Sequence, residues 1–361
     1  MKAWILFVLT IILLTLILWI LLYKEKEGFE TPTNTPTNTP MPVFDPKDPY
    51  KEEKRIFPFR YFTDMSGISL PMVAVTGFFR DKEAKMKYYE YKQKGFHIFG
   101  ITAYKTFPNK HRLDESEGKF EKEDDFDYTG NIKHWLCCFK QKEQFGFTDF
   151  NEVIEMSESD FYTAEDFQPV PKKYDFIYIC NKDGDGCPLN GWNAINRNFD
   201  LALKCFPILM KEFKLKGLVL GREGCGLEAL YGDRIEIAGF LEWHVLQEKM
   251  RESRMLFVPN IYDASPRVVA ECITKDVPVL MNEEILCGSK YIHPETGEFF
   301  STEANFKPAL QRLLARIDTI SPREWWKQHY NQKDSYKKLR DFLAKSFPGT
   351  LDHVDAVKFI L

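Results

Sequence analysis

The sequence predicts an α/β protein with two doubly wound domains, each built on a largely parallel sheet. The chain has 361 residues, of which 44% are hydrophobic and 15% aromatic, and this is enough apolar material for two cores of ordinary size. Short apolar runs recur along it, separated by segments with helical patterns and by turn residues. Such continuous apolar runs are typical of strands that are buried on both faces of a parallel sheet.

Residues 1–27 are expected to form a single transmembrane helix that anchors the chain. Residues 3–23 carry no charged side chain, and this stretch is long enough to cross a hydrocarbon core as a helix. Trp4, Trp19 and Tyr23 stand where interfacial aromatic side chains are found in membrane proteins. A cleavable signal peptide is the competing interpretation, but the apolar run is too long for one and lacks a small-x-small cleavage site.

Residues 28–55 are expected to be a linker rich in proline and threonine that holds the folded part off the membrane. Residues 31–40 read TPTNTPTNTP and have almost nothing to bury, so they should be extended and solvated. The basic residues on the two sides of the anchor nearly balance and do not fix its orientation. The absence of an N-x-S/T sequon and the many cysteines favour a cytoplasmic location for the folded part.

Charge and cysteine spacing exclude several classes of site. The net charge is -4, with 49 basic and 53 acidic residues well mixed, so nucleic acid is not an expected partner. The eight cysteines form no CxxC pair and do not alternate with histidines. Neither a zinc site nor a disulfide framework is therefore expected, and buried free thiols are the expected state of these residues.

Residues 56–170 are expected to form the first αβ domain. Strands are expected at residues 72–75, 97–101 and 135–139, and a helix at residues 81–94. The acidic stretch 114–127 is expected to be a surface loop with solvated charges.

Residues 171–320 are expected to form the second domain, and two prolines and two lysines in residues 169–173 mark the boundary before it. The expected strands are 176–180, 217–221, 235–237, 255–259 and 277–281, and the expected helices are 198–213, 243–252 and 267–274. This alternation predicts a doubly wound sheet that binds ligands at the carboxyl ends of its strands. Residues 321–361 are expected to form C-terminal helices, and the helix that starts at Ser321 is expected to cross back to the first domain.

The segment 263–271 follows a predicted buried strand and opens a predicted helix. The first turn of a helix has free backbone N–H groups and a positive dipole end, which suit a diphosphate. Ser265 can cap this helix, and Pro266 fits its first turn. The amides of Arg267 and Val268 are then free to point at phosphate oxygens.

Two carboxylates bracket this segment. Asp263 lies in the predicted loop and Glu271 eight positions later in the predicted helix, so they can reach opposite ends of one elongated ligand, where one would bind sugar hydroxyls and the other a ribose. Here the sequence resembles the retaining glycosyltransferases of the GT-B fold, especially family four. Their signature is a Glu, seven residues, a second Glu and then a "GxPV" segment. Asp263 takes the first position with a carboxylate one methylene shorter, and Asp276 to Val279 take the tail.

Other motifs of that family appear in the right order. Arg197 opens an RNFDL segment that resembles the family's "K-N-x-D-L", whose cation faces the donor diphosphate, and Lys182 stands where a second cation is expected. A guanidinium can bind phosphate oxygens with two hydrogen bonds, which keeps arginine suitable there. Residues 221–224, 237–241 and 296–300 resemble the family's "GxG", "F-x-G-x" and "TGxLV" segments.

The resemblance implies a GT-B fold, with two Rossmann-like domains facing a cleft. It places the acceptor on residues 56–170 and the nucleotide-sugar donor on residues 171–320. The catalytic residues that it implies are Asp263, Arg197 and Glu271. The donor-binding residues that it implies are Lys182, Arg197, Gly221, Arg222, Phe240, Leu241, Ser265, Pro266, Arg267, Val268 and Glu271.

The implied activity is transfer of a sugar from a nucleotide sugar to a glycan, protein or lipid acceptor. The resemblance also implies that the anomeric configuration is retained and that neither a metal nor a cofactor is required. His97, His111 and His134 are candidates for a histidine in the cleft, but none stands in a motif, and no catalytic base is assigned. Arg80 could contact phosphate or acceptor, or could equally be a solvated loop residue.

Two other functions remain open at this point. Asp183-Gly184-Asp185 is a D-x-D triplet, the metal-binding signature of a GT-A-like transferase, although turn residues explain it equally well. The other is a non-catalytic, membrane-tethered carbohydrate-binding or structural protein built on a transferase fold.

Overall fold

The computed structural model describes residues 50, 56–102, 107–108, 125–140, 145–166, 168–184, 186–263 and 266–359, all of which belong to the compact unit Pro46–Leu361. The expected anchor at residues 1–27 and nearly all of the expected linker at residues 28–55 lie outside these ranges. Within the described ranges, no helix combines the length and the apolar character that crossing a bilayer requires.

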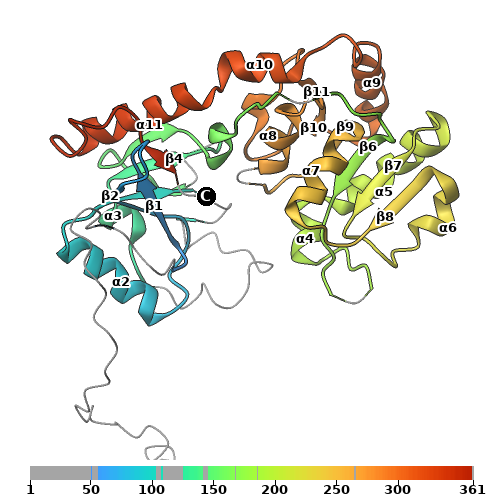
Figure 1. Cartoon of the computed structure of the whole chain (residues 1–361). Helices are drawn as coiled ribbons and strands as arrows, with labels where there is room; N and C mark the ends of the chain where they lie inside the picture. The colour runs from blue at the N-terminus through green and yellow to red at the C-terminus, as the bar shows by residue number, and fades with distance from the viewer. Residues whose placement is uncertain are drawn as a thin grey trace, which may run out of the picture. The chain divides into compact units, whose positions relative to one another are not determined.

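The first sheet, of which Figure 1 labels β1, β2 and β4, has the strand order β12-β1-β2-β3-β4-β5. Its strands are β1 Phe59–Thr63, β2 Ser69–Val75, β3 His97–Ile101, β4 His134–Cys137, β5 Glu152–Glu155 and β12 Lys358–Phe359. The pairs from β2 to β5 are parallel, whereas β1 runs antiparallel to both β2 and β12. The largely parallel sheet is therefore confirmed, and the expected strand 135–139 ends at Cys137.

Helix α2, Lys82–Gln93, confirms the helix expected at residues 81–94. Asp81 caps it, because its carboxylate accepts a hydrogen bond from the amide of Ala84 at 2.8 Å. Its apolar side is aromatic, with Tyr88 and Tyr91 buried against the first sheet. A further short helix, α3 Tyr128–Asn131, follows most of the acidic stretch, of which only residues 125–127 are described.

The second sheet has the order β11-β10-β9-β6-β7-β8, and all its pairs are parallel. Its strands are β6 Tyr174–Ile179, β7 Gly217–Leu220, β8 Ile235–Ala238, β9 Ser253–Val258, β10 Val279–Asn282 and β11 Gly297–Phe300. This is the strand order of the dinucleotide-binding fold. Successive strands are added to one side of the first strand, and the fourth strand is then placed on its other side, so the strand order reverses between the first and fourth strands. The doubly wound sheet is confirmed, and its switch point lies between β6 and β9.

The helices of this part are α4 Trp192–Asn196, α5 Phe199–Pro207, α6 Leu227–Tyr231, α7 Trp243–Arg251, α8 Arg267–Ile273 and α9 Glu303–Leu314, and its one-turn segments are η5 Glu158–Phe161, η6 Ile208–Glu212, η7 Gly232–Arg234 and η8 Ser289–Tyr291. The helix expected at residues 198–213 is broken. Asn198 has a left-handed backbone with φ of 48° and caps α5. Pro207 has no N–H to donate, and the chain continues as the π-helical turn η6.

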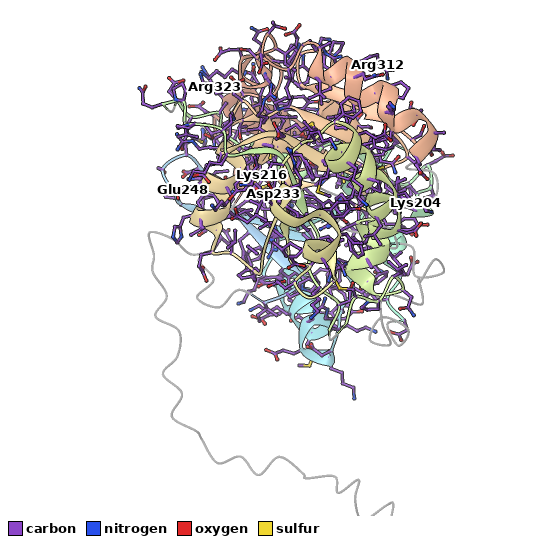
Figure 2. All side chains as sticks on the ribbon, turned by 90° about the vertical axis from the view of Figure 1, so that its right-hand side faces the viewer. Lys204, Lys216, Asp233, Glu248, Arg312 and Arg323 are labelled. Carbon is purple, nitrogen blue, oxygen red and sulfur yellow. A yellow bond between two sulfur atoms is a disulfide. The ribbon has the colours of Figure 1, made fainter. Side chains whose placement is uncertain are left out.

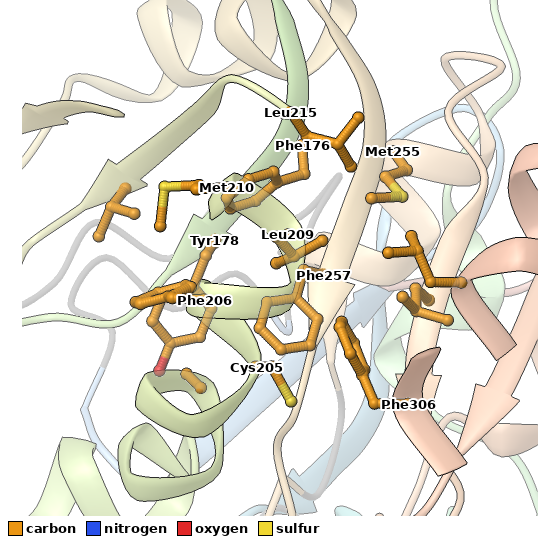
Figure 3. Packing of buried hydrophobic residues seen from close by; sticks show 14 of the residues in the cluster. Phe176, Tyr178, Cys205, Phe206, Leu209, Met210, Leu215, Met255, Phe257 and Phe306 are labelled. Carbon is orange, nitrogen blue, oxygen red and sulfur yellow. The ribbon is translucent and has the colours of Figure 1, made fainter. Parts of the chain in front are cut away.

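One core cluster fills the space between the second sheet and the helices α4, α5, α6 and α9 (Figure 3), whereas α7 and α8 pack in another. Phe257 of β9 stands at its centre, with its ring 5.4 Å from that of Phe306 on α9 and 6.3 Å from that of Phe206 on α5. These aromatic contacts hold the helices against the sheet on which the loops of the candidate site are mounted.

The expected C-terminal helices are α10, Pro322–His329, and α11, Gln332–Ser346. Trp326 of α10 packs in a core cluster of the second sheet. Leu339 and Leu343 of α11 instead pack with residues of the first sheet, where β12 also pairs with β1. The expected return to the first domain is therefore made by α11 and β12 and not by the helix that follows Ser321.

Charged side chains of both signs share the surface of the described part. Figure 2 shows among them Lys204, Asp233 and Arg312, all of which are exposed. Many of these charges are paired locally, as Lys204 is with Asp200 at 2.5 Å.

Two histidines lie at the amino ends of neighbouring parallel strands, His97 on β3 and His134 on β4. Both rings contact Phe347, at centroid distances of 4.5 Å and 4.8 Å. His97 Nε2 lies 2.7 Å from Thr350 Oγ1, and His134 Nδ1 lies 3.1 Å from a carboxylate oxygen of Glu152. Because the ligand crevice of such a sheet is at the carboxyl ends, these two candidates for a cleft histidine are not placed in it.

Lowering the pH should destabilise the chain through these histidines. Burial lowers the pKa of His97, and burial lowers that of His134 although Glu152 opposes the shift. The unfolded chain then binds more protons than the folded one, so the free energy of unfolding should fall as the pH drops below about 6.5. We expect the melting temperature to fall between pH 7 and pH 5.5, and to fall less in His97→Gln. Parallel curves for the two proteins would contradict this assignment.

Candidate active site

The loops that follow β6, β7, β8 and β9 carry most of the residues that the sequence singles out. Lys182 follows β6, Gly221 follows β7, Phe240 follows β8, and Asp263 follows β9. Parallel strands end at the same edge of a sheet, so the fold gathers these residues at the carboxyl edge, around the switch point between β6 and β9.

An ion pair joins two of the three predicted catalytic residues at this edge. Arg197 Nη1 donates a hydrogen bond to Asp263 Oδ2, and Asn260 Nδ2 donates to the same oxygen at 3.0 Å. The Asp263 side chain is 10% exposed and that of Arg197 is 29% exposed, so the pair lies partly within reach of solvent. A guanidinium has five N–H groups, and the bond to Asp263 leaves others for a ligand.

Backbone hydrogen bonds fix the two segments that bear this pair. Arg197 ends α4, where its amide donates to the carbonyl of Asn193 at 2.8 Å. The amide of Ile261, in the loop before Asp263, donates to the carbonyl of Asn196 at 3.3 Å. The carbonyl of Ile261 in turn accepts from the amide of Leu286 at 2.9 Å. The loop after β9 is thus held from both sides.

Glu271, the third predicted catalytic residue, lies on α8 and is 5% exposed. Its Oε1 accepts a hydrogen bond from the hydroxyl of Tyr162 at 2.8 Å and a longer one from Trp243 Nε1 at 3.5 Å. Its Oε2 accepts no hydrogen bond from the described residues. One oxygen is therefore held by the protein, and the other can accept from a ligand.

The helix expected at residues 267–274 is α8, which begins at Arg267 as expected. Its N-cap residue is Pro266, with φ of -70° and ψ of 80°, where the cap was expected at Ser265. Ser265, the expected cap, lies outside the described residues. Arg267 is exposed, and Val268 is half-buried against a core cluster. The expected contacts of this turn with phosphate remain a prediction.

Asp183 and Arg222 have structural roles that the sequence did not indicate. Asp183 caps α4: its two oxygens accept from the amides of Asn193 and Ala194 at 2.7 Å and 2.8 Å. Arg222 is fully buried, and its Nη2 donates to Asp183 Oδ2 at 3.3 Å and to Cys180 Sγ at 2.8 Å. Its guanidinium therefore faces a partner inside the protein, and the contact with the donor that the sequence suggests for it remains a prediction. Both oxygens of Asp183 are occupied, which weighs against the D-x-D interpretation.

A disulfide joins Cys187 to Cys225, which corrects the expectation that all cysteines are free. Cys187 lies in the loop after β6 and Cys225 in the loop after β7, so the bond connects two neighbouring loops of the carboxyl edge. The two positions are 38 residues apart, and no local spacing pattern announces such a pair. The other six cysteines are free and buried, as expected.

The remaining residues that are predicted to bind the nucleotide-sugar donor differ in how far they are exposed to solvent. Gly221 has φ of +85° and packs directly on the backbone of residues 180–181. Phe240 is 83% exposed, and Leu241 is half-buried in a core cluster. Lys182 is exposed and forms no hydrogen bond or ion pair with a described residue.

The other candidates from the sequence are not brought to this edge or are not described. Arg80 is exposed, with its guanidinium 4.2 Å from the ring centroid of Phe57. His111 and Asp185 lie outside the described residues. In the described ranges, no group of three or more His, Cys, Asp and Glu side chains is arranged to hold a metal ion.

Tyr162, Trp243 and Asn260 are site residues that sequence reasoning missed. Tyr162 precedes Glu271 by 109 positions and Trp243 precedes it by 28. No periodic pattern links residues at such separations. Asn260 is different, because it stands three positions before Asp263 in the same loop, and its amide could have been recognised as a partner for that carboxylate.

Comparison with known proteins finds similar structures but no match in sequence. No family model matches the chain. No curated protein matches it either.

Solved structures do match. TarM from S. aureus aligns with a TM-score of 0.55 at 12% identity, over 75% of this chain and 54% of TarM. A sucrose-phosphate synthase from Thermosynechococcus elongatus aligns with a TM-score of 0.51 at 15% identity, over 77% of this chain and 74% of that one. A glycosyltransferase from Rickettsia africae aligns with a TM-score of 0.50 at 13% identity, over 77% of both chains. This chain thus spans about half the length of TarM, and the likenesses show that it has the GT-B fold.

Proposed function

We propose that this chain is a glycosyltransferase that moves a sugar from a nucleotide-sugar donor to an acceptor. The observation that carries the proposal is the Arg197–Asp263 pair at the switch point of a sheet with the dinucleotide-binding strand order. The cation suits the diphosphate of a donor, and the carboxylate suits the hydroxyls of its sugar. The GT-B fold supports the proposal, because the solved structures that share it include glycosyltransferases.

In the proposed reaction the bond from the anomeric carbon to the diphosphate oxygen breaks, and both electrons remain on that oxygen. Arg197, with Lys182 earlier in the same connection after β6, offsets the negative charge that develops there. The oxygen of an acceptor hydroxyl forms the new bond to the anomeric carbon, and the hydroxyl proton passes to the leaving diphosphate. We propose retention of configuration and no metal requirement, both of which follow from the resemblance in sequence.

The proposed donor is a UDP-sugar, and the acceptor class is left to experiment. Crystal structures of a TarM mutant and of the pneumococcal O-GlcNAc transferase GtfA contain UDP, so UDP-sugars are the first donors to test.

The test is thermal unfolding of the full-length chain with UDP-, GDP-, ADP- and CMP-sugars, each with and without manganese. We expect one nucleotide family to raise the melting temperature without manganese, and we expect Glu271→Gln to abolish that shift. Release of the nucleoside diphosphate then measures turnover. Stabilisation only with manganese would favour a metal-dependent transferase, and binding without turnover would favour a non-catalytic sugar-binding protein.

A matched control variant is Glu236→Gln. The carboxylate of Glu236 also accepts a hydrogen bond from a tyrosine, Tyr174, at 2.7 Å, but it lies on β8 rather than in the candidate site. This variant should keep the full shift with the donor. An equal loss in both variants would mean that the shift does not report on the Glu271 site, and no shift with any nucleotide sugar would refute the proposed function.

We also propose that residues 3–23 hold the enzyme at a membrane, on the apolar run described above. Alkaline carbonate extraction of membranes from cells that express the full-length chain tests this. The chain should remain in the pellet, and a version that begins at Lys51 should not. Release of the full-length chain into the supernatant would refute the anchor.

A further inference from the structure

Tyr162 lies in the segment that joins the two sheets, just after η5 and before β6. Its hydroxyl donates to Glu271 Oε1 at 2.8 Å, and its carbonyl accepts a hydrogen bond from Trp326 Nε1 on α10 at 2.9 Å. One residue of this connecting segment therefore contacts two helices, one of which bears a predicted donor-binding carboxylate.

In the contact between Tyr162 and Glu271, the tyrosine hydroxyl is the hydrogen-bond donor and the carboxylate is the acceptor that it orients. Burial raises the pKa of Tyr162, and the neighbouring charge of Glu271 raises it further. The hydroxyl therefore keeps its proton at any ordinary pH and donates to the carboxylate. Of the two donors to Oε1, the tyrosine is the shorter by 0.7 Å, the difference between 3.5 Å and 2.8 Å, so it contributes most of the orientation.

We infer that Tyr162 is a positioning residue for donor binding. Its hydroxyl holds one oxygen of Glu271, and this directs the other oxygen toward a hydroxyl of the donor's ribose. The inference rests on the proposed function and adds a residue that no sequence motif contains.

Removal of this hydroxyl should be tolerated by the fold. Tyr162 is half-buried and borders a cavity of about 430 Å³, which is also lined by Trp243 and Lys275. The ring is thus not enclosed by dense packing, and Tyr162→Phe keeps all of its carbon atoms. Tyr174→Phe is a matched control, because Tyr174 also donates to a glutamate, at 2.7 Å, on β8.

The test combines the variant with a change in the ligand. Affinities of the nucleoside diphosphate that stabilises the wild type, and of its 2′-deoxy and 3′-deoxy forms, are measured by calorimetry for the wild type, Tyr162→Phe and Tyr174→Phe. A hydrogen bond to a charged group corresponds to about a tenfold change in affinity or more. We expect Tyr162→Phe to bind the ribose form about tenfold more weakly, and to lose less than the wild type when one ribose hydroxyl is removed. Tyr174→Phe should behave as the wild type.

The outcomes separate the inference from the proposed function. The positioning role is refuted, and the transferase stands, in either of two cases. The first is that Tyr162→Phe binds nucleoside diphosphate as well as the wild type does. The second is that removal of a ribose hydroxyl costs the variant as much affinity as it costs the wild type. If the wild type binds no nucleoside diphosphate, both are refuted. Should Tyr162→Phe fail to fold, Trp243→Phe serves in its place. Trp243→Phe removes the other donor to Glu271 Oε1, from a residue that is 64% exposed. This variant should also lose less affinity than the wild type when a ribose hydroxyl is removed, by a smaller margin than is expected for Tyr162→Phe.

Discussion

Replacing Arg197 by alanine is expected to weaken nucleoside diphosphate binding by about 100-fold, since a cation that contacts phosphate makes charge-assisted hydrogen bonds. The same change removes Arg197 from its ion pair with Asp263, whose side chain is 10% exposed and keeps the hydrogen bond from Asn260. Loss of the cation beside a nearly buried carboxylate destabilises the fold, here by about 2 kcal/mol, which is less than for a fully buried pair because Arg197 itself is partly solvated. Calorimetry and urea unfolding measure the two effects separately.

The double variant Arg197→Ala with Asp263→Asn distinguishes a binding role from a structural one. It removes both charges, so most of the lost stability should return while binding stays weak. Arg254→Ala is the control for loss of an arginine elsewhere, since Arg254 pairs with Asp175 and Asp318. Recovery of binding in the double variant would show that Arg197 acts only by neutralising Asp263.

The second sheet could be predicted from local pattern because its strands are buried on both faces. Val279 to Met281 on β10 are fully buried, and such strands read as uninterrupted apolar runs. The edges of the first sheet could not be predicted in this way. β12 has only two residues, and it pairs with β1, the first strand, although the two strands lie near opposite ends of the described sequence. Lys358 is opposite Thr63. Pairing at such separation depends on tertiary packing and leaves no local signal.

The candidate site was predictable to the extent that it follows strand ends. Arg197 and Asp263 were both expected on strand-to-helix connections, and the structure joins them in an ion pair. What local reasoning could not supply is which cation is accessible. Arg222 also follows a strand, yet it turns inward to Asp183, because its guanidinium packs over the Phe199 ring at 4.3 Å. Burial of this kind is set by neighbours that are distant in sequence.

The glycine after β7 should be among the least replaceable residues of the candidate site. Gly221 has φ of +85°, and a Cβ there would stand 2.7 Å from both the carbonyl oxygen of Cys180 and Cα of Asn181. These are backbone atoms, which cannot rotate away as a side chain could. The left-handed conformation alone costs about 1–2 kcal/mol, and the clash adds a similar amount or more. We expect Gly221→Ala to lower the free energy of unfolding by about 4 kcal/mol.

Gly224 in the same loop isolates the effect of the clash. Its φ of +72° imposes similar backbone strain, but a Cβ there would meet nothing within 4 Å. Gly224→Ala should therefore cost only about 1–2 kcal/mol in urea unfolding and should leave donor binding unchanged. Gly221→Ala should weaken donor binding as well, because the clash pushes the loop after β7 away from the loop that carries Lys182. Equal losses of stability in the two variants would mean that the close approach of these loops contributes nothing beyond the φ angle.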